Sequence, residues 1–366
     1  MNALLHVIPT AMDLLSIMLC IGLLASLVWV TPDVASAGKL HDTLWRLLGP
    51  ALTALTLISL IGLLQRTAEM GGLAWDGILS SLPLVLLQTH YGMTWFVRAA
   101  AIIVLWLLWW PGQRYGSRRI ACAMLLLTAC VVWSVAASGH GGDWGDFTLS
   151  EWMWWLHIMS ASLWVGAILA FVLGIQRQLR DPSKRALFAV CAGRLSSLAG
   201  MALALVLATG AYNAWHQLGH VSELWSSHYG RIILFKLMLV GLMSMLGAFN
   251  RYFNLPLLCR DENRSLSGQQ PAQLSPLGIL QRFRPLWQLR GVPIRRFTRS
   301  VILEVWLALG VLICAALLGH TMPPRKSNVL PSQETSIEQP GMSLPDLHQS
   351  FSCSVSSIWL THQSSA

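Results

Sequence analysis

The stretch SGHGGDWGDFTLSEWMWWLHIMSASLWVGAILAFVLG (residues 138–174) passes from an acidic, glycine-rich segment into an apolar run. The run at 152–174 holds no Asp, Glu, Lys or Arg, and as a helix it can cross the roughly 30 Å hydrocarbon core of a bilayer. Thr148 and Glu151 have the spacing of a capping box, which predicts a helix start at about Leu149. This stretch therefore predicts a transmembrane helix that begins directly after a polar loop.

The rest of the chain repeats this pattern. Hydrophobic residues make up 54% of its 366 positions and charged residues 11%, which is the composition of a membrane protein. None of the apolar windows shows the alternation of a barrel strand, so we predict an all-α, polytopic bundle. About eight windows are long enough to be transmembrane helices, at 11–30, 44–64, 91–110, 119–138, 152–174, 190–214, 229–250 and 300–319. Residues 78–90, interrupted by Pro83, are interpreted as a half-buried approach to the third span.

Basic residues predict the orientation. Of the 25 Lys and Arg residues, 19 lie in or beside the connections 31–43, 111–118, 175–189 and 251–299. The positive-inside rule places these connections in the cytoplasm, so both termini of an eight-span chain are expected to be periplasmic. Contact with anionic membrane lipid accounts for the net charge of +9 without a nucleic-acid partner.

The sequence predicts two regions. Residues 1–320 form the eight-helix transmembrane domain, which includes a basic cytoplasmic loop at 253–299. Residues 321–366 are polar, rich in Ser, Gln and Pro, and without helical periodicity, so we expect a disordered periplasmic tail.

Histidine is distributed in the opposite way to Lys and Arg. On this topology ten of the eleven histidines fall on or near the outer side, and only His41 lies inside. Imidazole and thioether groups are ligands suited to copper, as Cu(I) or Cu(II). The candidate metal ligands are His140, His157, His216, His220, Met153 and Met159. Plainer interpretations stay open, because a His near a helix end is often interfacial and a Met in a span usually packs.

His157 is the most deeply placed of these histidines. Helical spacing puts it on one face with Met153 and Trp164, and the small residues that include Gly166 favour close helix packing, so His157 is expected to point into the bundle. An ionisable group at that depth is a functional-site candidate, with His140 as its expected partner.

Three acidic residues lie in the segment between His140 and His157. Asp143, Asp146 and Glu151 lie there without any Lys or Arg, and we expect them to act as a cation funnel by raising the local cation concentration.

His216 and His220 form a second outer group. Their i, i+4 spacing on a helix would make a two-histidine metal clip, but Gly219 indicates that the helix is already ending. A ligand pair and an exposed loop therefore both remain open.

Several charges lie inside predicted spans. Arg98 and Arg231 are within about a turn of the outer helix ends, where long side chains are expected to snorkel to the interface. Lys236 lies two turns deep and needs a partner or a water-filled cavity, and Asp13 in the first span is a candidate counter-ion.

Glu304 in the last span is expected to pair with Arg194 or Arg251. The seven cysteines include no C-x-x-C pair, so no disulfide is predicted. No nucleophile–base motif, phosphate loop or H-E-x-x-H is present, and we therefore do not expect an enzyme.

An ordered set of segments resembles the bacterial copper-resistance protein D family (CopD/PcoD type). The segments are THYGMTWFVRA (89–99), SGHGG (138–142), LHIMSASLWVGAI (156–168), TGAYNAW (209–215), HYGRIILFKLMLVGLMSMLGAFNRY (228–252) and RSVILEVWLALGVLICAALLG (299–319). The likeness covers nearly all of 1–320. It implies a multi-pass protein of the bacterial inner membrane that imports periplasmic copper, beside a periplasmic copper-binding partner protein.

Two other hypotheses remain at this point. A b-type cytochrome would bind haem between two histidines at similar depth on facing helices. A membrane anchor would only hold the periplasmic copper-binding protein, and would then tolerate mutation of Lys236.

Overall fold

A computed structural model describes residues 2–34, 37–71, 77–139, 145, 147–176, 184–256 and 293–324. Every regular element within these ranges is helical, which agrees with the all-α prediction. Most of the basic loop 253–299 and of the tail 321–366 lies outside the described residues, so their assignment stays a prediction.

Eight helical segments have the length and apolarity to cross a membrane, and they confirm the eight predicted windows. The helices of these segments are α1 (Asn2–Ala25), α2 (Gly38–Gly71), α4 (His90–Tyr115), α5 (Arg118–Ser138), α6 (Leu149–Ala170), α8 (Arg185–Leu218), α10 (His228–Phe249) and α12 (Pro293–Gly319). Three of them continue into π-helical turns: α1 into η1 (Ser26–Val30), α6 into η5 (Phe171–Ile175) and α10 into η7 (Asn250–Asn254).

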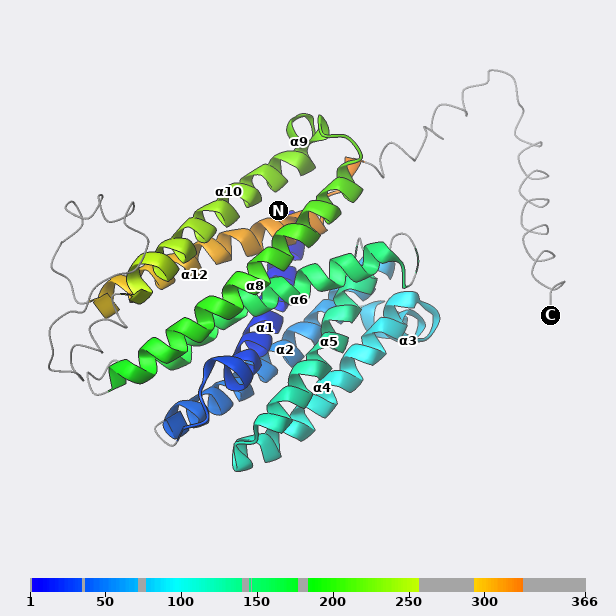
Figure 1. Cartoon of the computed structure of the whole chain (residues 1–366). Helices are drawn as coiled ribbons and strands as arrows, with labels where there is room; N and C mark the ends of the chain where they lie inside the picture. The colour runs from blue at the N-terminus through cyan, green and yellow to red at the C-terminus, as the bar shows by residue number, and fades with distance from the viewer. Residues whose placement is uncertain are drawn as a thin grey trace, which may run out of the picture. The chain divides into compact units, whose positions relative to one another are not determined.

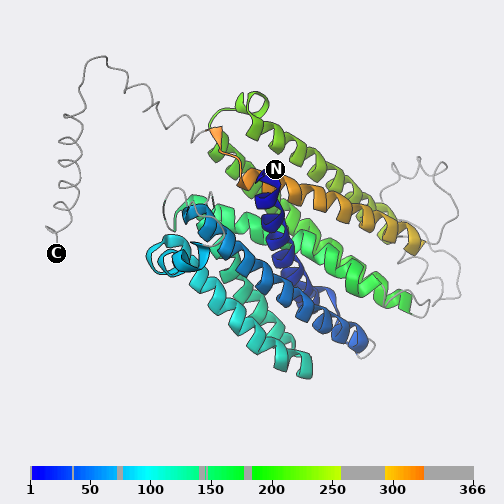
Figure 2. The same cartoon turned by 180° about the vertical axis from the view of Figure 1, so that it is seen from behind.

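Two shorter helices connect spans. The stretch interpreted as an approach to the third span is α3 (Ile78–Gln88), a separate helix of 11 residues that contains Pro83. The other is α9 (Glu223–Ser226), a single turn between α8 and α10. Successive spans run in opposite directions, as Figures 1 and 2 show.

Helix α1 lies at the centre of the bundle. It packs against α2 and α5 on one side and against α6 and α12 on the other. Beyond these contacts, α2, α4 and α5 pack together, α6 packs on α8, and α10 packs on α12. The bundle therefore has an N-terminal group of helices (α2, α4 and α5) and a C-terminal group (α6, α8, α10 and α12). The two groups meet at α1 and where α5 packs on α6.

Glycine allows the closest of these contacts. A Cβ atom on Gly22 of α1 would lie 1.9 Å from the backbone carbon of Gly166 on α6, and one on Gly166 would lie 1.9 Å from the Met18 carbonyl oxygen. The two backbones touch, as in small-residue crossings of membrane helices. The close packing predicted around Gly166 is confirmed.

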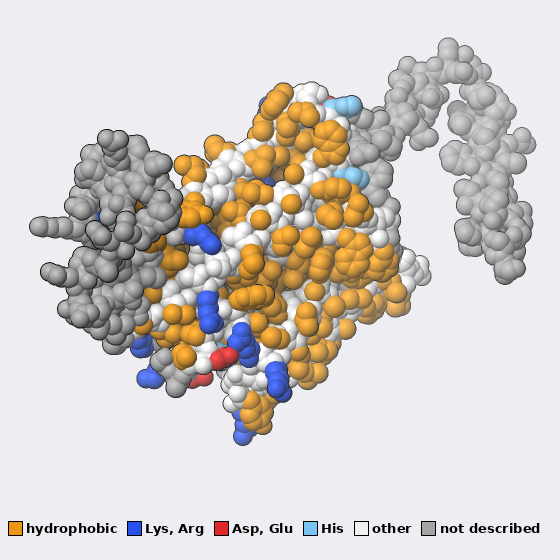
Figure 3. All heavy atoms as spheres, viewed as in Figure 1, with side chains coloured by type: hydrophobic (Ala, Val, Ile, Leu, Met, Phe, Trp, Pro, Cys, Tyr) orange, Lys and Arg blue, Asp and Glu red, His pale blue; other side chains and the backbone are white. Residues whose placement is uncertain are grey.

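Charged residues separate along the bundle axis. We call the end where α2, α5, α8 and α12 begin the basic end, and the opposite end, where α4, α6 and α10 begin, the histidine end. Figure 3 shows Lys and Arg gathered mostly toward one end of the visible face and His at the other. At the basic end Arg118 also pairs with Asp33 at 2.6 Å. The assignment of the basic end to the cytoplasm stays a prediction.

Candidate functional site

The start of α6 positions the candidate site. The Thr148 hydroxyl accepts a hydrogen bond from the Glu151 amide, as the capping box predicts. Glu151 reaches back to the amide of Phe147, one residue before the cap, and its carboxylate is buried. This observed capping role accounts for Glu151, and its part in a cation funnel stays a prediction.

His157 points into the bundle, as predicted. Its ring stacks against Trp154, and its Nδ1 lies 3.0 Å from the Thr209 hydroxyl on α8. A Cβ on residue 210 would lie 3.1 Å from the His157 ring, so Gly210 leaves the space in which the ring lies. Helices α6 and α8 therefore hold the imidazole from both sides.

The Thr209 hydroxyl determines which imidazole nitrogen carries the proton. It donates its own hydrogen to the Leu205 carbonyl at 2.6 Å, so it accepts from His157. Nδ1 of a neutral His157 is then the N–H donor, and Nε2 keeps its lone pair. The Val206 backbone on α8 is a further hydrogen-bond partner of the His157 ring. A hydrogen bond from Nδ1 to an oxygen holds a histidine in the tautomer in which Nε2 can bind a metal.

Lys236 on α10 lies in the same region of the bundle. Its charge interacts electrostatically with His157 and with Cys314 on α12. Within the described ranges Lys236 makes no hydrogen bond or ion pair, and it is half-buried. A positive charge beside His157 opposes a cation bound at Nε2, so Lys236 can weaken the binding of a metal there.

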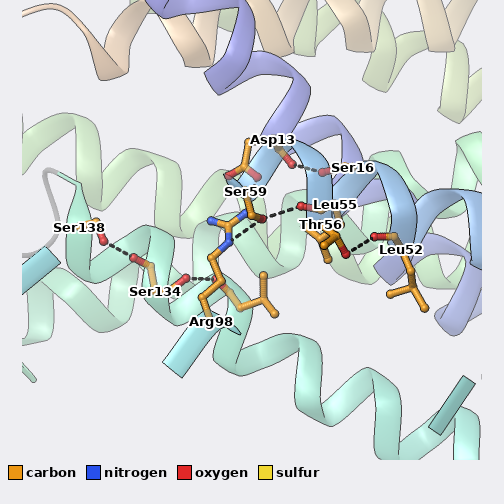
Figure 4. A network of polar contacts seen from close by, with 10 residues as sticks. Asp13, Ser16, Leu52, Leu55, Thr56, Ser59, Arg98, Ser134 and Ser138 are labelled. Atoms are coloured by element: carbon orange, nitrogen blue, oxygen red, sulfur yellow. Dashed lines mark hydrogen bonds and ion pairs between the residues drawn. The ribbon is translucent and has the colours of Figure 1, made fainter. Parts of the chain in front are cut away.

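Asp13 is not the counter-ion of Lys236, and that prediction was wrong. Asp13 forms an ion pair with Arg98 of α4, whose Nε also donates to the Ser59 hydroxyl on α2 at 3.0 Å. Figure 4 shows the guanidinium between Asp13 and Ser59. Arg98 is only 9% exposed, so its predicted snorkelling was also wrong. The reason is that α1 and α2 bring polar partners to Arg98 inside the bundle.

His216 and His220 do not lie on one helix. Gly219 ends α8 with a φ of 75°, a conformation that favours glycine, and His220 follows this residue. His216 stacks on Tyr212 at 5.9 Å, while His220 is exposed. The helical spacing on which a two-histidine clip depends is therefore absent.

The other candidate ligands have different surroundings. Met159 packs against the apolar core, and Met153 is half-buried with its carbonyl 3.5 Å from the Asn213 amide. His140, Asp143 and Asp146 lie outside the described residues. Among the residues that are described, no group of three or more His, Cys, Asp or Glu side chains could hold a metal ion.

Thr209 is the partner of His157 that the sequence reasoning did not identify. The sequence did hold a pattern that could have identified it. Thr209 and Asn213 are at positions i and i+4, and such residues share one face of a helix. Both side chains contact α6, Thr209 through His157 and Asn213 through Met153. Because Thr209 faces His157 from α8, this contact gives no support to haem ligation by two histidines.

Two family models match the chain. The model described as copper resistance protein D-like, N-terminal domain, matches residues 1–146, and the model described as copper resistance protein D matches residues 189–318. Helix α6, with His157, lies between the two matched regions.

Curated relatives agree with these models. The chain is 29% identical to the copper transport protein CutJ of Bacillus subtilis (strain 168), in a match that spans 56% of this chain and 39% of CutJ. It is 27% identical to copper resistance protein D of Pseudomonas syringae pv. tomato, over 59% of this chain and 72% of that protein. It is 24% identical to the inner membrane protein YebZ of Escherichia coli (strain K12), over 57% of this chain and 71% of that protein. No solved structure matches the chain. The chain belongs to the copper resistance protein D family.

Proposed function

We propose that this protein transports copper across the bacterial inner membrane and takes it up from the periplasmic side. Family membership supports copper as the cargo. The eight apolar helices support a multi-pass protein, and the relative YebZ is named as an inner membrane protein. No catalytic step is part of this proposal.

His157 is the proposed copper ligand within the bundle. The observation that carries this assignment is the hydrogen bond from His157 Nδ1 to Thr209, which leaves the lone pair on Nε2. A neutral imidazole nitrogen with its lone pair accepts either Cu(I) or Cu(II). Copper would reach this nitrogen from the histidine end, where His140 is the proposed second ligand and Asp143 and Asp146 attract the cation.

The orientation follows from the distribution of charge. With the basic end in the cytoplasm, His157 lies in the half of the bundle nearer the periplasm. Copper delivered by a periplasmic copper-binding protein would then meet His157 before it meets Lys236. We propose import on this basis, with Lys236 limiting how long the ion stays at His157.

Copper accumulation in cells tests the proposal. Cells that express His157→Ala at membrane levels matched to the wild type should accumulate less copper. His228→Ala is the matched control, because His228 is an exposed histidine at the same end of the bundle. Equal accumulation in wild-type and His157→Ala cells would exclude His157 from the path.

A further inference from the structure

The C-terminal group of helices encloses a cavity of about 710 Å³ in the half of the bundle nearer the basic end. Helices α8 and α10 form its walls and contribute three serines, while α12 and η7 contribute its titratable groups. Small residues leave the space open, among them Gly200 and Ala204 on α8 and Gly247 and Ala248 on α10. Gly200 and Ala248 are exposed, so the cavity opens on the lateral surface of the spans, and the exposed Arg251 and Tyr252 of η7 line its end nearer the basic end.

Glu304 is the carboxylate that lines this cavity. It is 6% exposed, and its Oε1 accepts a hydrogen bond of 2.7 Å from the Asn250 amide nitrogen. Asn254 donates to the Asn250 oxygen, also at 2.7 Å, and so fixes which way the Asn250 amide points. The two asparagines therefore hold one oxygen of Glu304, while Oε2 has no hydrogen-bond partner in the described ranges.

No ion pair neutralises Glu304 within the described ranges, and the pairing predicted for it was wrong. Arg251 donates to the Ser196 carbonyl at 3.0 Å and to its hydroxyl at 3.4 Å. Arg194 donates to the Thr31 carbonyl at 3.5 Å. Each arginine thus uses its hydrogen bonds on α8 or on the end of η1, and neither contacts the carboxylate.

The other groups around the cavity do not compensate for a charge on Glu304. Besides Glu304, the titratable residues that line it are Arg251 and Tyr252. Tyr252 is 70% exposed, and α6 contributes only Trp164 and Ile168. An ionised carboxylate with one amide donor is costly inside a membrane, whereas the neutral acid avoids this cost.

We propose that Glu304 is a proton-exchange site that opens into the cavity between α8 and α10. The carboxylate would take a proton from water that enters at the η7 end of the cavity, form an O–H bond at Oε2 and return the proton to that water when it ionises again. Asn250 stabilises the ionised form, because its N–H donates to Oε1.

This site would give the proposed transport a group whose charge changes at the basic end. That connection rests on the proposed function, whereas proton exchange at Glu304 does not. The test is therefore made without copper, so that failure of the site can be distinguished from failure of the transport proposal.

Infrared difference spectra of the purified, copper-free protein in lipid nanodiscs test the site. Lowering the pH should produce the C=O band of a protonated carboxylic acid, which shifts in heavy water. Glu304→Gln should remove that band, and Glu223→Gln on α9 should leave it, with near-ultraviolet circular dichroism confirming that both variants fold. Asn250→Leu should keep the band to higher pH, since the ionised form loses its donor.

A band that survives in Glu304→Gln would overturn the proposal. So would a wild-type protein without the band at any pH at which it stays folded, because Glu304 would then not change its protonation state. Unchanged pH dependence in Asn250→Leu would contradict the role given to Asn250.

Discussion

The two groups of helices treat their buried charges differently. In the N-terminal group, Arg98 has an acid and a hydroxyl as partners, contributed by α1 and α2. In the C-terminal group, Lys236 and Glu304 form no ion pair within the described ranges, and Glu304 lines a cavity. Paired charges hold helices together, whereas unpaired charges inside a membrane mark positions where ions or protons bind. On this basis we propose that the first group serves stability and the second serves transport.

The largest effect on stability is expected from Asp13→Ala. It leaves the Arg98 guanidinium buried without an anion, and breaking a buried pair costs about 3–5 kcal/mol. Denaturant unfolding of the detergent-solubilised protein measures this loss. The control is Asp33→Ala, which breaks the exposed pair with Arg118, where about 0–1 kcal/mol is expected. Equal losses in the two variants would show that the Asp13–Arg98 pair is not structural.

A smaller loss is expected where the two groups meet. Gly166→Ala places a methyl group inside the contact distance of the α1 backbone, and overpacking costs about 1–3 kcal/mol. Gly241→Ala is the matched control on α10, because an added Cβ there has no neighbour within 4 Å. That control should be neutral or slightly stabilising in the same unfolding experiment. A stable Gly166→Ala protein would mean that α1 and α6 can separate at little cost.

Thr209→Val should weaken copper binding without unfolding the protein. It removes the oxygen that accepts from His157 Nδ1, and loss of such a partner typically lowers metal affinity about 10–100-fold. Competition titration of the purified protein with a copper chelator measures the affinity. Thr209→Ser retains the hydroxyl and should bind as the wild type does. If Thr209→Val binds copper as tightly as Thr209→Ser does, the Thr209 hydrogen bond does not prepare His157 for copper.

The smallest effect is expected from Lys236→Met. It removes a positive charge that acts on His157, so copper should bind several-fold more tightly in the same titration. Transport should slow, because the ion is released less readily. Weaker binding in Lys236→Met would show that the lysine helps to form the site.

Local patterns in the sequence predicted much of the fold. Apolar windows predicted the eight spans, Thr148 predicted the start of α6, and Gly166 predicted a close contact. Each of these signals depends on neighbours along one helix or on the length of one segment. The inward direction of His157 was predictable for the same reason.

Partners that come from distant segments were not predictable in this way. Arg98 binds a residue 85 positions away and another 39 positions away, so its partners are known only once α1, α2 and α4 are placed. Thr209 lies 52 positions from His157. The i, i+4 spacing of His216 and His220 also failed to predict their arrangement, because the positive φ of Gly219 ends the helix before His220.

X-ray absorption at the copper edge tests the central claim most directly. Purified wild-type protein loaded with one equivalent of copper should show the scattering pattern of an imidazole ligand. That pattern should weaken or disappear in His157→Ala and remain in His228→Ala. An unchanged copper spectrum in His157→Ala would contradict the assignment of His157 as the copper ligand within the bundle.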